Sequence, residues 1–470
     1  MIRELFSGRS VALGLLFALL LSPFQNFIEF LIIPIFIIFL LFFDKTDLIL
    51  FLIISSFLVF SRSIGSDFRD LLQYFNLTFL GIMFIIRNLH EEIKLPRLSK
   101  ELVQFLVFYF SALIIASIFA NKMFAGWQHI LRQIIFFGII YILYSLIGSL
   151  KTVIYFVTSI LIAALFHTFL TLYALYQQNF DIMAFGSEYF LSLSSDLMTN
   201  KNTIGIYIIY ALIFNLTLFI YLKNVWLKFS SILITLLLTF GLFLINSRAV
   251  ILALIVAGLY LLYSYRRKVF YYSLIILASC IALLFIPPFD ELVSFYFRVE
   301  DLLGQRDIII KSSWSLIENE WLLGTGPGGT KELLYKYIPF MLGTPEELWI
   351  RHHFNQIEYG HAHNYFLFML SDLGVLGLLS AGFLIFAFLR IGNRVRRYYS
   401  DKDKIIFSLT MAILSLGIGM FVRGLFEWGG ILGYGMINTD LPFWISFAIL
   451  IYFDRKRIET ADRDIVSKRS

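Results

Sequence analysis

Residues that could carry out proton or phosphate chemistry are concentrated in one stretch of an otherwise apolar chain. Residues 360–382 read GHAHNYFLFMLSDLGVLGLLSAG, which places His363 and Asn364 at the start of a run typical of a lipid-buried helix. An imidazole can exchange a proton near neutral pH. His363 is therefore a titratable group at a predicted water boundary, although for this residue alone an interfacial histidine without a catalytic role is the simpler interpretation.

Two glycines share the predicted helix with that histidine. Gly374 follows His363 by eleven residues and Gly377 by fourteen. At about 100° and about 1.5 Å per residue, both would lie within roughly 40° of the histidine's face and about 16 to 21 Å deeper. Small residues let a neighbouring helix approach closely, or leave room for a lipid chain. Packing is the favoured interpretation of these glycines.

Two arginines, Arg248 and Arg423, lie at membrane depth, where they need an anionic or polar partner. Arg423 could pair with Glu427 one helical turn later, which would be a structural role. Arg248 and Arg306 have no carboxylate at helical spacing, and the adjacent Asp307 would point elsewhere. A diphosphate is a fitting partner, because a guanidinium can hold phosphate oxygens with paired hydrogen bonds.

The segment GTGPGG at Gly324–Gly329 superficially looks like a phosphate-binding loop. A P-loop needs Lys and then Ser or Thr after its last glycine, whereas here Thr330 precedes Lys331, so we reject nucleotide binding. Two roles stay open for Gly326 and Gly328: a backbone turn that approaches a ligand, or one that ends the preceding helix. For Asp372 we expect a structural hydrogen bond.

Four histidines fall within twelve residues and raise the question of a metal site, because imidazoles suit zinc or copper. They are His352, His353, His361 and His363. No HExxH motif accompanies them, Glu358 is the only nearby carboxylate, and the single cysteine, Cys280, lies in an apolar run. We therefore expect neither a metal nor another cofactor.

Composition defines the elements that must position these residues. The chain has 470 residues, of which 59% are hydrophobic and 15% are charged, and its mean hydropathy is +0.82. This balance predicts an all-α polytopic membrane protein. The formal charge of +6 is explained by loop asymmetry, so we expect membrane lipids and not nucleic acid as partners.

Segments of about 17 to 25 apolar residues can cross a bilayer. We predict 12 to 14 spans, because the first few are short. They lie near 10–24, 27–43, 48–60, 71–86, 102–119, 134–150, 152–175, 203–222, 229–246, 249–264, 269–287, 362–390, 405–424 and 439–453.

Lys and Arg are concentrated in alternate connections, which predicts that these connections and both termini are cytoplasmic. The opposite side receives the segments near 61–70, 120–133, 177–201, 247–248, 288–361 and 425–438. Apolar residues recur at helical spacing within 305–323 of the long outer loop, and they predict a helix at the membrane interface with Trp314 and Trp321 at headgroup level. A simple loop anchor is the alternative.

These motifs together resemble the O-antigen ligase and O-antigen polymerase superfamily of bacterial membrane glycosyltransferases. The family's His-Asn, nine residues and Gly-x-x-Gly are met by His363, Asn364, Gly374 and Gly377. The sequence around Arg306, Trp314 and 324–329 is similar to the family's outer loop, NSRAV at Arg248 to its Ser-Arg turn, and NKNTIG from Asn200 to an earlier span. The resemblance covers residues 195–390, between N-terminal helices at 1–194 and C-terminal helices with a cytoplasmic tail at 391–470.

The resemblance implies metal-independent, inverting transfer of a glycan from undecaprenyl diphosphate at the periplasmic face of the inner membrane. It implies that His363 is the general base, that Arg248 and Arg306 hold the diphosphate, and that substrate contacts come from Asn364, Arg423, Gly326 and Gly328. We expect a ligase with a lipid A–core acceptor. A polymerase with a second lipid-linked repeat as acceptor is the alternative. A transporter is a third possibility, but the matching half-repeats typical of many transporters are not evident.

Overall fold

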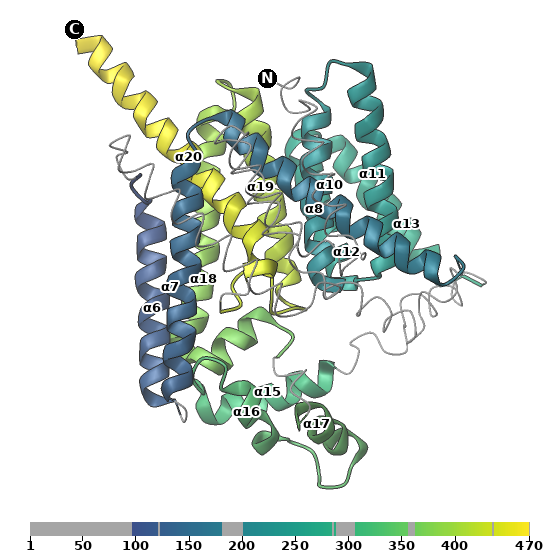
Figure 1. The fold of residues 1–470 in the computed structure, drawn as a ribbon, viewed down its shortest axis with the longest axis vertical. Helices are drawn as coiled ribbons and strands as arrows, with labels where there is room; N and C mark the ends of the chain where they lie inside the picture. The colour runs from purple at the N-terminus through teal and green to yellow at the C-terminus, as the bar shows by residue number, and fades with distance from the viewer. Residues whose placement is uncertain are drawn as a thin grey trace, which may run out of the picture. The chain divides into compact units, whose positions relative to one another are not determined.

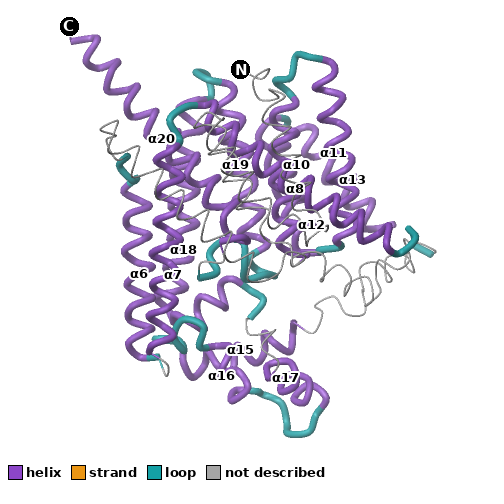
Figure 2. The backbone as a smooth tube through the Cα atoms, viewed as in Figure 1, coloured by secondary structure: helices purple, strands orange, loops and turns teal. Residues whose placement is uncertain are grey.

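The computed structural model describes residues 96–120, 123–180, 201–283, 286–287, 306–355, 362–434 and 437–469. Within these ranges every regular element is helical, which confirms the all-α fold (Figure 2). The chain divides into two compact units: the first holds Pro96 and Ile139–Ile251, and the second holds Arg97–Gly138 and the residues from Leu252 onward. The two units are described separately below.

Eight helices in the described part of the chain are long and apolar enough to cross a membrane, so this is a polytopic membrane protein. They are α6 (Lys100–Phe119), α7 (Met123–Leu146), α8 (Leu150–Gln177), α10 (Lys201–Phe219), α11 (Val225–Ile245), α12 (Arg248–Tyr265), α18 (Tyr365–Tyr399) and α19 (Lys404–Arg423). The helices α13 (Arg267–Leu283) and α20 (Ile437–Arg469) match two further predicted spans. The four spans predicted before residue 90 lie outside the described residues, so the total of 12 to 14 stays a prediction.

In the first unit, α8, α10 and α11 pack against one another. The helix α10 is buried along most of its length, as expected for a helix that is apolar on all faces. Its Asn215 amide donates to the Ser231 carbonyl and the Thr235 hydroxyl of α11, both at 2.9 Å. Hydrogen bonds of this kind satisfy buried polar groups between membrane helices.

In the second unit, α18 runs alongside α6 and also contacts α19 and α20 (Figure 1). Aromatic rings fill the core of this unit, with Trp444 of α20 almost fully buried between Phe105 of α6 and Phe137 of α7. Gly417 of α19 leaves the space that the Phe388 ring of α18 occupies. A smooth helix surface thus accepts a large side chain from its neighbour.

The helices α7 and α20 extend furthest beyond their predicted boundaries. The helix α7 begins at Met123, so the predicted outer segment at 120–133 is wrong over most of its length. The prediction ended the span there because polar residues such as His129 and Gln133 interrupt the apolar run. In the structure Gln133 is buried within the helix and accepts a hydrogen bond from Tyr109 at 3.2 Å. The helix α20 likewise continues through the charged C-terminal segment to Arg469.

The described part of the long outer loop forms a small helical cluster, drawn below the membrane helices of its own unit in Figures 1 and 2. It comprises α15 (Arg306–Glu320), α16 (Thr330–Leu333), η3 (Leu334–Tyr337) and α17 (Pro345–Asn355). Ile309 and Leu316 of α15 form its core with Leu334. The helix predicted within 305–323 is therefore confirmed. Trp314 and Trp321 are exposed, as expected at a membrane interface, but the location of the helix at that interface stays a prediction.

Candidate active site

The helix α18 begins at the predicted His-Asn pair. Asn364 is its N-cap: the side-chain oxygen accepts from the backbone N–H groups of Phe366 at 2.9 Å and Leu367 at 3.0 Å. The amide of Asn364 also donates to the Leu425 carbonyl at 2.9 Å. Because the first N–H groups of a helix lack partners within it, this cap fixes where α18 starts. The structure thus gives Asn364 a capping role, and its contact with substrate stays a prediction.

His363 precedes the cap and lies beside a buried carboxylate. Its Nδ1 atom is 3.5 Å from Oε2 of Glu427, and the side chains are 21% and 5% exposed, respectively. The backbone of His363 has a φ of +47°, in the left-handed region that few residues other than glycine adopt. The N–H of Tyr365 donates to the Gly424 carbonyl at 2.7 Å, so the start of α18 is tied to the end of α19. Together these contacts hold a partly exposed imidazole against an acidic group.

Arg423 lies at the end of α19 and is 1% exposed. Its Nη1 atom donates to the Gly429 carbonyl at 2.5 Å. Arg423 thus supports the turn that carries Glu427, and its contact with substrate stays a prediction.

The GTGPGG segment ends α15 and docks on α18 through Asp372. The Asp372 carboxylate accepts from the Gly328 N–H at 2.8 Å, from the Thr330 N–H at 3.1 Å and from the Thr330 hydroxyl. The Gly326 N–H donates to the Asp372 carbonyl at 3.0 Å. The structural role expected of Asp372 is confirmed, and so is the role of the segment as a helix-ending turn.

Gly326 and Gly328 face protein and not open space. A Cβ on Gly326 would collide with Ala120, and one on Gly328 would lie 2.8 Å from Nε2 of His129. Both glycines have φ values in the left-handed range, +90° and +76°. Their N–H groups, which a phosphate would need, already donate to Asp372. These contacts give both glycines a structural role, and their contact with substrate stays a prediction.

The helix α18 is interrupted at Gly374, where φ is +65° and ψ is −160°. A Cβ at this position would collide with the carbonyl of Leu322, which accepts the N–H of Val375 at 3.3 Å. A Cβ on Gly377 would likewise collide with the Met369 carbonyl. The prediction of one straight helix face running from His363 to both glycines is wrong, because the break changes their orientation. Both glycines are closely packed, but against a loop and the preceding turn, and the predicted approach of a neighbouring helix or a lipid chain stays a prediction.

Arg248 begins α12 in the first unit, directly after Asn246, which has left-handed dihedral angles, and Ser247. The Ser247 hydroxyl lies 2.6 Å from Oδ1 of Asn202, so the NSRAV and NKNTIG motifs meet in space. Arg306 begins α15 in the second unit, and its side chain lies outside the described residues. His363 belongs to the second unit, so its grouping with Arg248 in one site stays a prediction.

No group of three or more metal-ligating side chains lies together in the described part of the chain. Of the four clustered histidines, His352 is exposed on α17, while His361 and the side chain of His353 lie outside the described residues. The expected absence of a metal therefore stays a prediction.

Two residues near the start of α18 were not identified from sequence. Glu427 was assigned to Arg423 alone, and no local pattern links it to a histidine sixty-four residues earlier. His129 lies beside the glycine-rich turn, 5.4 Å ring to ring from Tyr434, and its Nδ1 has no hydrogen-bond partner among described atoms. The sequence analysis placed His129 in the predicted outer segment at 120–133, where no motif marks it.

Comparison with known proteins finds a similarity over part of the chain. Residues 232–382 match the family described as O-antigen ligase, and no curated protein gives a significant match. The matched region includes Arg248, Arg306, the glycine-rich turn and the start of α18 with His363. The resemblance seen in the sequence is thus confirmed for this region. Residues 232–382 of this polytopic membrane protein are thus similar to the O-antigen ligase family.

Proposed function

We propose that this protein transfers a glycan from undecaprenyl diphosphate to an acceptor hydroxyl, with His363 as the general base. The family match supports an enzyme that acts on a lipid-linked glycan and an acceptor. The observation that carries the assignment of the base is the partly exposed His363 imidazole against the buried Glu427 carboxylate. A base held by a carboxylate at one ring nitrogen can take up a proton at the other.

In the proposed step, the acceptor oxygen attacks the anomeric carbon while its proton passes to Nε2 of His363. The bond from the anomeric carbon to the diphosphate oxygen breaks, and undecaprenyl diphosphate leaves with that electron pair. Attack from the face opposite the leaving group inverts the anomeric centre. Glu427 stabilises the imidazolium that forms, because an opposite charge nearby favours the charged form of a group.

Arg248 and Arg306 would hold the diphosphate and neutralise its charge as it leaves. Guanidiniums suit this role because their paired N–H groups match phosphate oxygens and their charge is retained at all working pH values. Such charge stabilisation can replace a metal ion at the leaving group. The positions of both arginines inside the family-matched region support this assignment.

The acceptor we propose is lipid A–core, which makes the protein an O-antigen ligase at the periplasmic face of the inner membrane. The ligase description of the matching family favours this acceptor over a second lipid-linked repeat, which a polymerase would use. The location rests on the Lys and Arg asymmetry of the loops, which also predicts cytoplasmic termini.

Glycan analysis after deletion of the gene tests the acceptor. Loss of a ligase leaves long polymer on undecaprenyl diphosphate, whereas loss of a polymerase leaves single repeats on lipid A–core. Unchanged surface and lipid-linked glycans would overturn both assignments. In a purified assay, Arg248→Ala and Arg306→Ala should each lose transfer while the protein stays folded, as judged by size-exclusion chromatography.

A further inference from the structure

The end of α18 farthest from His363 carries a basic pocket that the proposed transfer reaction does not use. The pocket has a volume of about 600 Å³. Arg394 lies thirty-one residues beyond His363 and twenty beyond the break at Gly374, which is about 30 Å of continuous helix. The pocket is lined by Arg390, Asn393, Arg394, Arg397, Tyr398 and Arg457.

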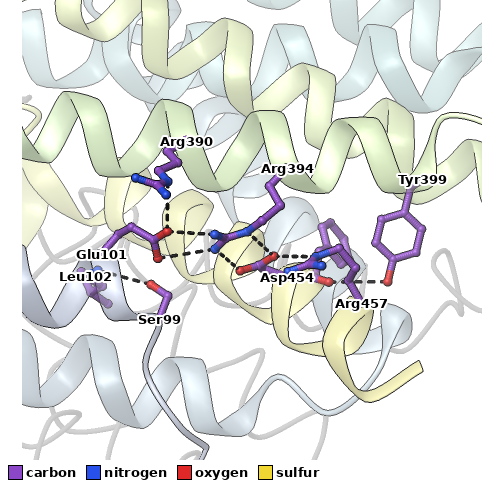
Figure 3. Close-up of polar contacts among 9 residues, drawn as sticks. Ser99, Glu101, Leu102, Arg390, Arg394, Tyr399, Asp454 and Arg457 are labelled. Carbon is purple, nitrogen blue, oxygen red and sulfur yellow. Dashed lines mark hydrogen bonds and ion pairs between the residues drawn. The ribbon is translucent and has the colours of Figure 1, made fainter. Parts of the chain in front are cut away.

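Two acidic residues from other helices hold Arg394 in the wall of this pocket (Figure 3). Its Nη1 atom donates to Glu101 of α6 at 2.8 Å, and its Nε atom donates to Asp454 of α20 at 3.0 Å. Both carboxylates are buried, at 10% and 3% exposure. Arg394 thus joins three helices and makes the wall of the pocket rigid.

The pocket contains more arginines than there are carboxylates in contact with them. Arg390 lies 3.4 Å from Glu101, and Arg457 lies 2.9 Å from Asp454, so each carboxylate serves two guanidiniums. The Arg397 guanidinium forms neither a hydrogen bond nor an ion pair with any residue that the structure describes. Four arginines against two carboxylates leave a formal excess of two positive charges around the pocket.

Tyr398 adds an uncharged donor to the same pocket. Its hydroxyl is shielded from solvent and has no hydrogen-bond partner among the described residues. The ammonium of Lys402 lies 3.8 Å from the centre of the Tyr398 ring, and this cation–π contact helps to hold the ring in place. A shielded hydroxyl next to excess positive charge favours an anionic, hydrogen-bond-accepting ligand.

The length of α18 places this pocket at the membrane surface. The continuous part of the helix after the break at Gly374, residues 375–399, spans about 37 Å, whereas the hydrocarbon core of a bilayer is about 30 Å thick. The last turns of the helix, which carry Arg390 to Arg397, therefore reach the headgroup level. Basic pockets between helices at this level suit phosphorylated headgroups.

We propose that this pocket binds a phosphate group, carried either by an acidic phospholipid headgroup or by a soluble phosphate. A planar guanidinium presents two N–H groups to one phosphate, and Arg397 supplies one whose charge no described carboxylate offsets. The Tyr398 hydroxyl donates an additional hydrogen bond. The site is separate from the proposed transfer chemistry, so its binding is measured without any activity assay.

Binding of phosphatidylglycerol to the full-length protein in neutral detergent, followed by native mass spectrometry, tests the proposal. Phosphatidylcholine serves as the comparison lipid. Arg397→Gln is expected to weaken phosphatidylglycerol binding about fivefold, because one surface cation contributes about that factor toward an anionic lipid. Tyr398→Phe should also weaken it. Arg396→Gln removes the same charge from the same turn outside the pocket and should leave binding nearly unchanged.

Titration with inorganic phosphate, read as thermal stabilisation, distinguishes the two sources. Stabilisation that Arg397→Gln abolishes and Arg396→Gln retains assigns the pocket to soluble phosphate. Selective lipid binding without such stabilisation assigns it to a phospholipid headgroup. Equal losses in Arg396→Gln and Arg397→Gln, or no preference for phosphatidylglycerol together with no effect of inorganic phosphate, would overturn the proposal.

Discussion

The Nδ1 atom of His363 lies 3.5 Å from Oε2 of Glu427, across the junction where α19 ends and α18 begins. The two residues are far apart in the sequence and meet because Asn364 and Tyr365 bind the backbone of Leu425 and Gly424. A general base benefits from an orienting partner and a balancing charge, and the proposed base, His363, lies beside a buried carboxylate at this junction.

Replacing His363 should abolish transfer, and replacing its acidic partner should slow it. We expect no measurable transfer for His363→Ala and a kcat lowered about 10- to 100-fold for Glu427→Gln, because general-base catalysis contributes on the order of 10²- to 10⁴-fold. The measurement is transfer of lipid-linked glycan by purified protein. Glu346→Gln, an exposed change on α17, is the matched control. Full activity of His363→Ala would remove this residue from the mechanism.

Asp372 should contribute to stability and not to chemistry. Asp372→Ala leaves two backbone N–H groups and the Thr330 hydroxyl without their acceptor, which should lower the free energy of unfolding by about 3 kcal/mol. Thr330→Val removes a single donor and should cost about 1 kcal/mol. Thermal unfolding in detergent measures both changes. Equal stability of Asp372→Ala and the wild type would contradict the docking role of the carboxylate.

Two glycines of α18 should respond in opposite ways to alanine. Gly374→Ala adds a Cβ that collides with Leu322 in a backbone conformation open almost only to glycine, and should destabilise the protein by about 3 kcal/mol. Gly382 has open space around its Cβ position, so Gly382→Ala should be neutral or stabilise by up to about 1 kcal/mol. The yield of monodisperse protein reports both outcomes. A normal yield of Gly374→Ala would show that the break in α18 is not required.

Removal of divalent metals should leave transfer intact. The proposed mechanism assigns charge stabilisation of the diphosphate to Arg248 and Arg306, so no metal ion is needed at the leaving group. Activity of the purified protein before and after EDTA treatment measures this. Loss of activity in EDTA and recovery with one added divalent ion would replace the arginine-only mechanism.

The outer-loop cluster should lose stability in acid through Glu347. Hydrogen bonds from the Arg351 side chain and from the Gly343 N–H at 3.1 Å lower the pKa of the Glu347 carboxyl below its usual value. A lowered folded-state pKa contributes stability that is present above the ordinary carboxyl pKa of about 4.3, and this stability is lost as pH falls through the lowered value.

Glu347→Gln therefore should be less stable than the wild type at pH 7, and the difference should shrink as the pH falls below about 4. Thermal unfolding of both proteins over this range measures the effect. Glu346→Gln, one residue away and exposed, should track the wild type. A difference between Glu347→Gln and wild type that does not change with pH would contradict the role of ionised Glu347.

Local sequence patterns were sufficient for much of the fold. The predicted spans at 102–119 and 405–424 agree with α6 and α19 to within two residues at each end, because an unbroken apolar run is itself the property that lets a helix lie in a bilayer. The helix within 305–323 was also predictable, because apolar residues recur there at helical spacing. The start of α7 was not, because its polar residues interrupt the apolar run, although one of them, Gln133, is buried and accepts a hydrogen bond from Tyr109 of α6.

Residue types and their spacing were enough to predict an all-α membrane protein, a helix that begins at the His363–Asn364 pair, and the resemblance to O-antigen ligases. The contacts of the folded chain were needed to find that Asp372 holds the glycine-rich turn, that Gly374 breaks α18 and that Glu427 faces His363. The first group depends on residue types at short, regular spacing, which set local conformation and burial. The second depends on contacts between segments as much as sixty-four residues apart, whose partners no local period can specify.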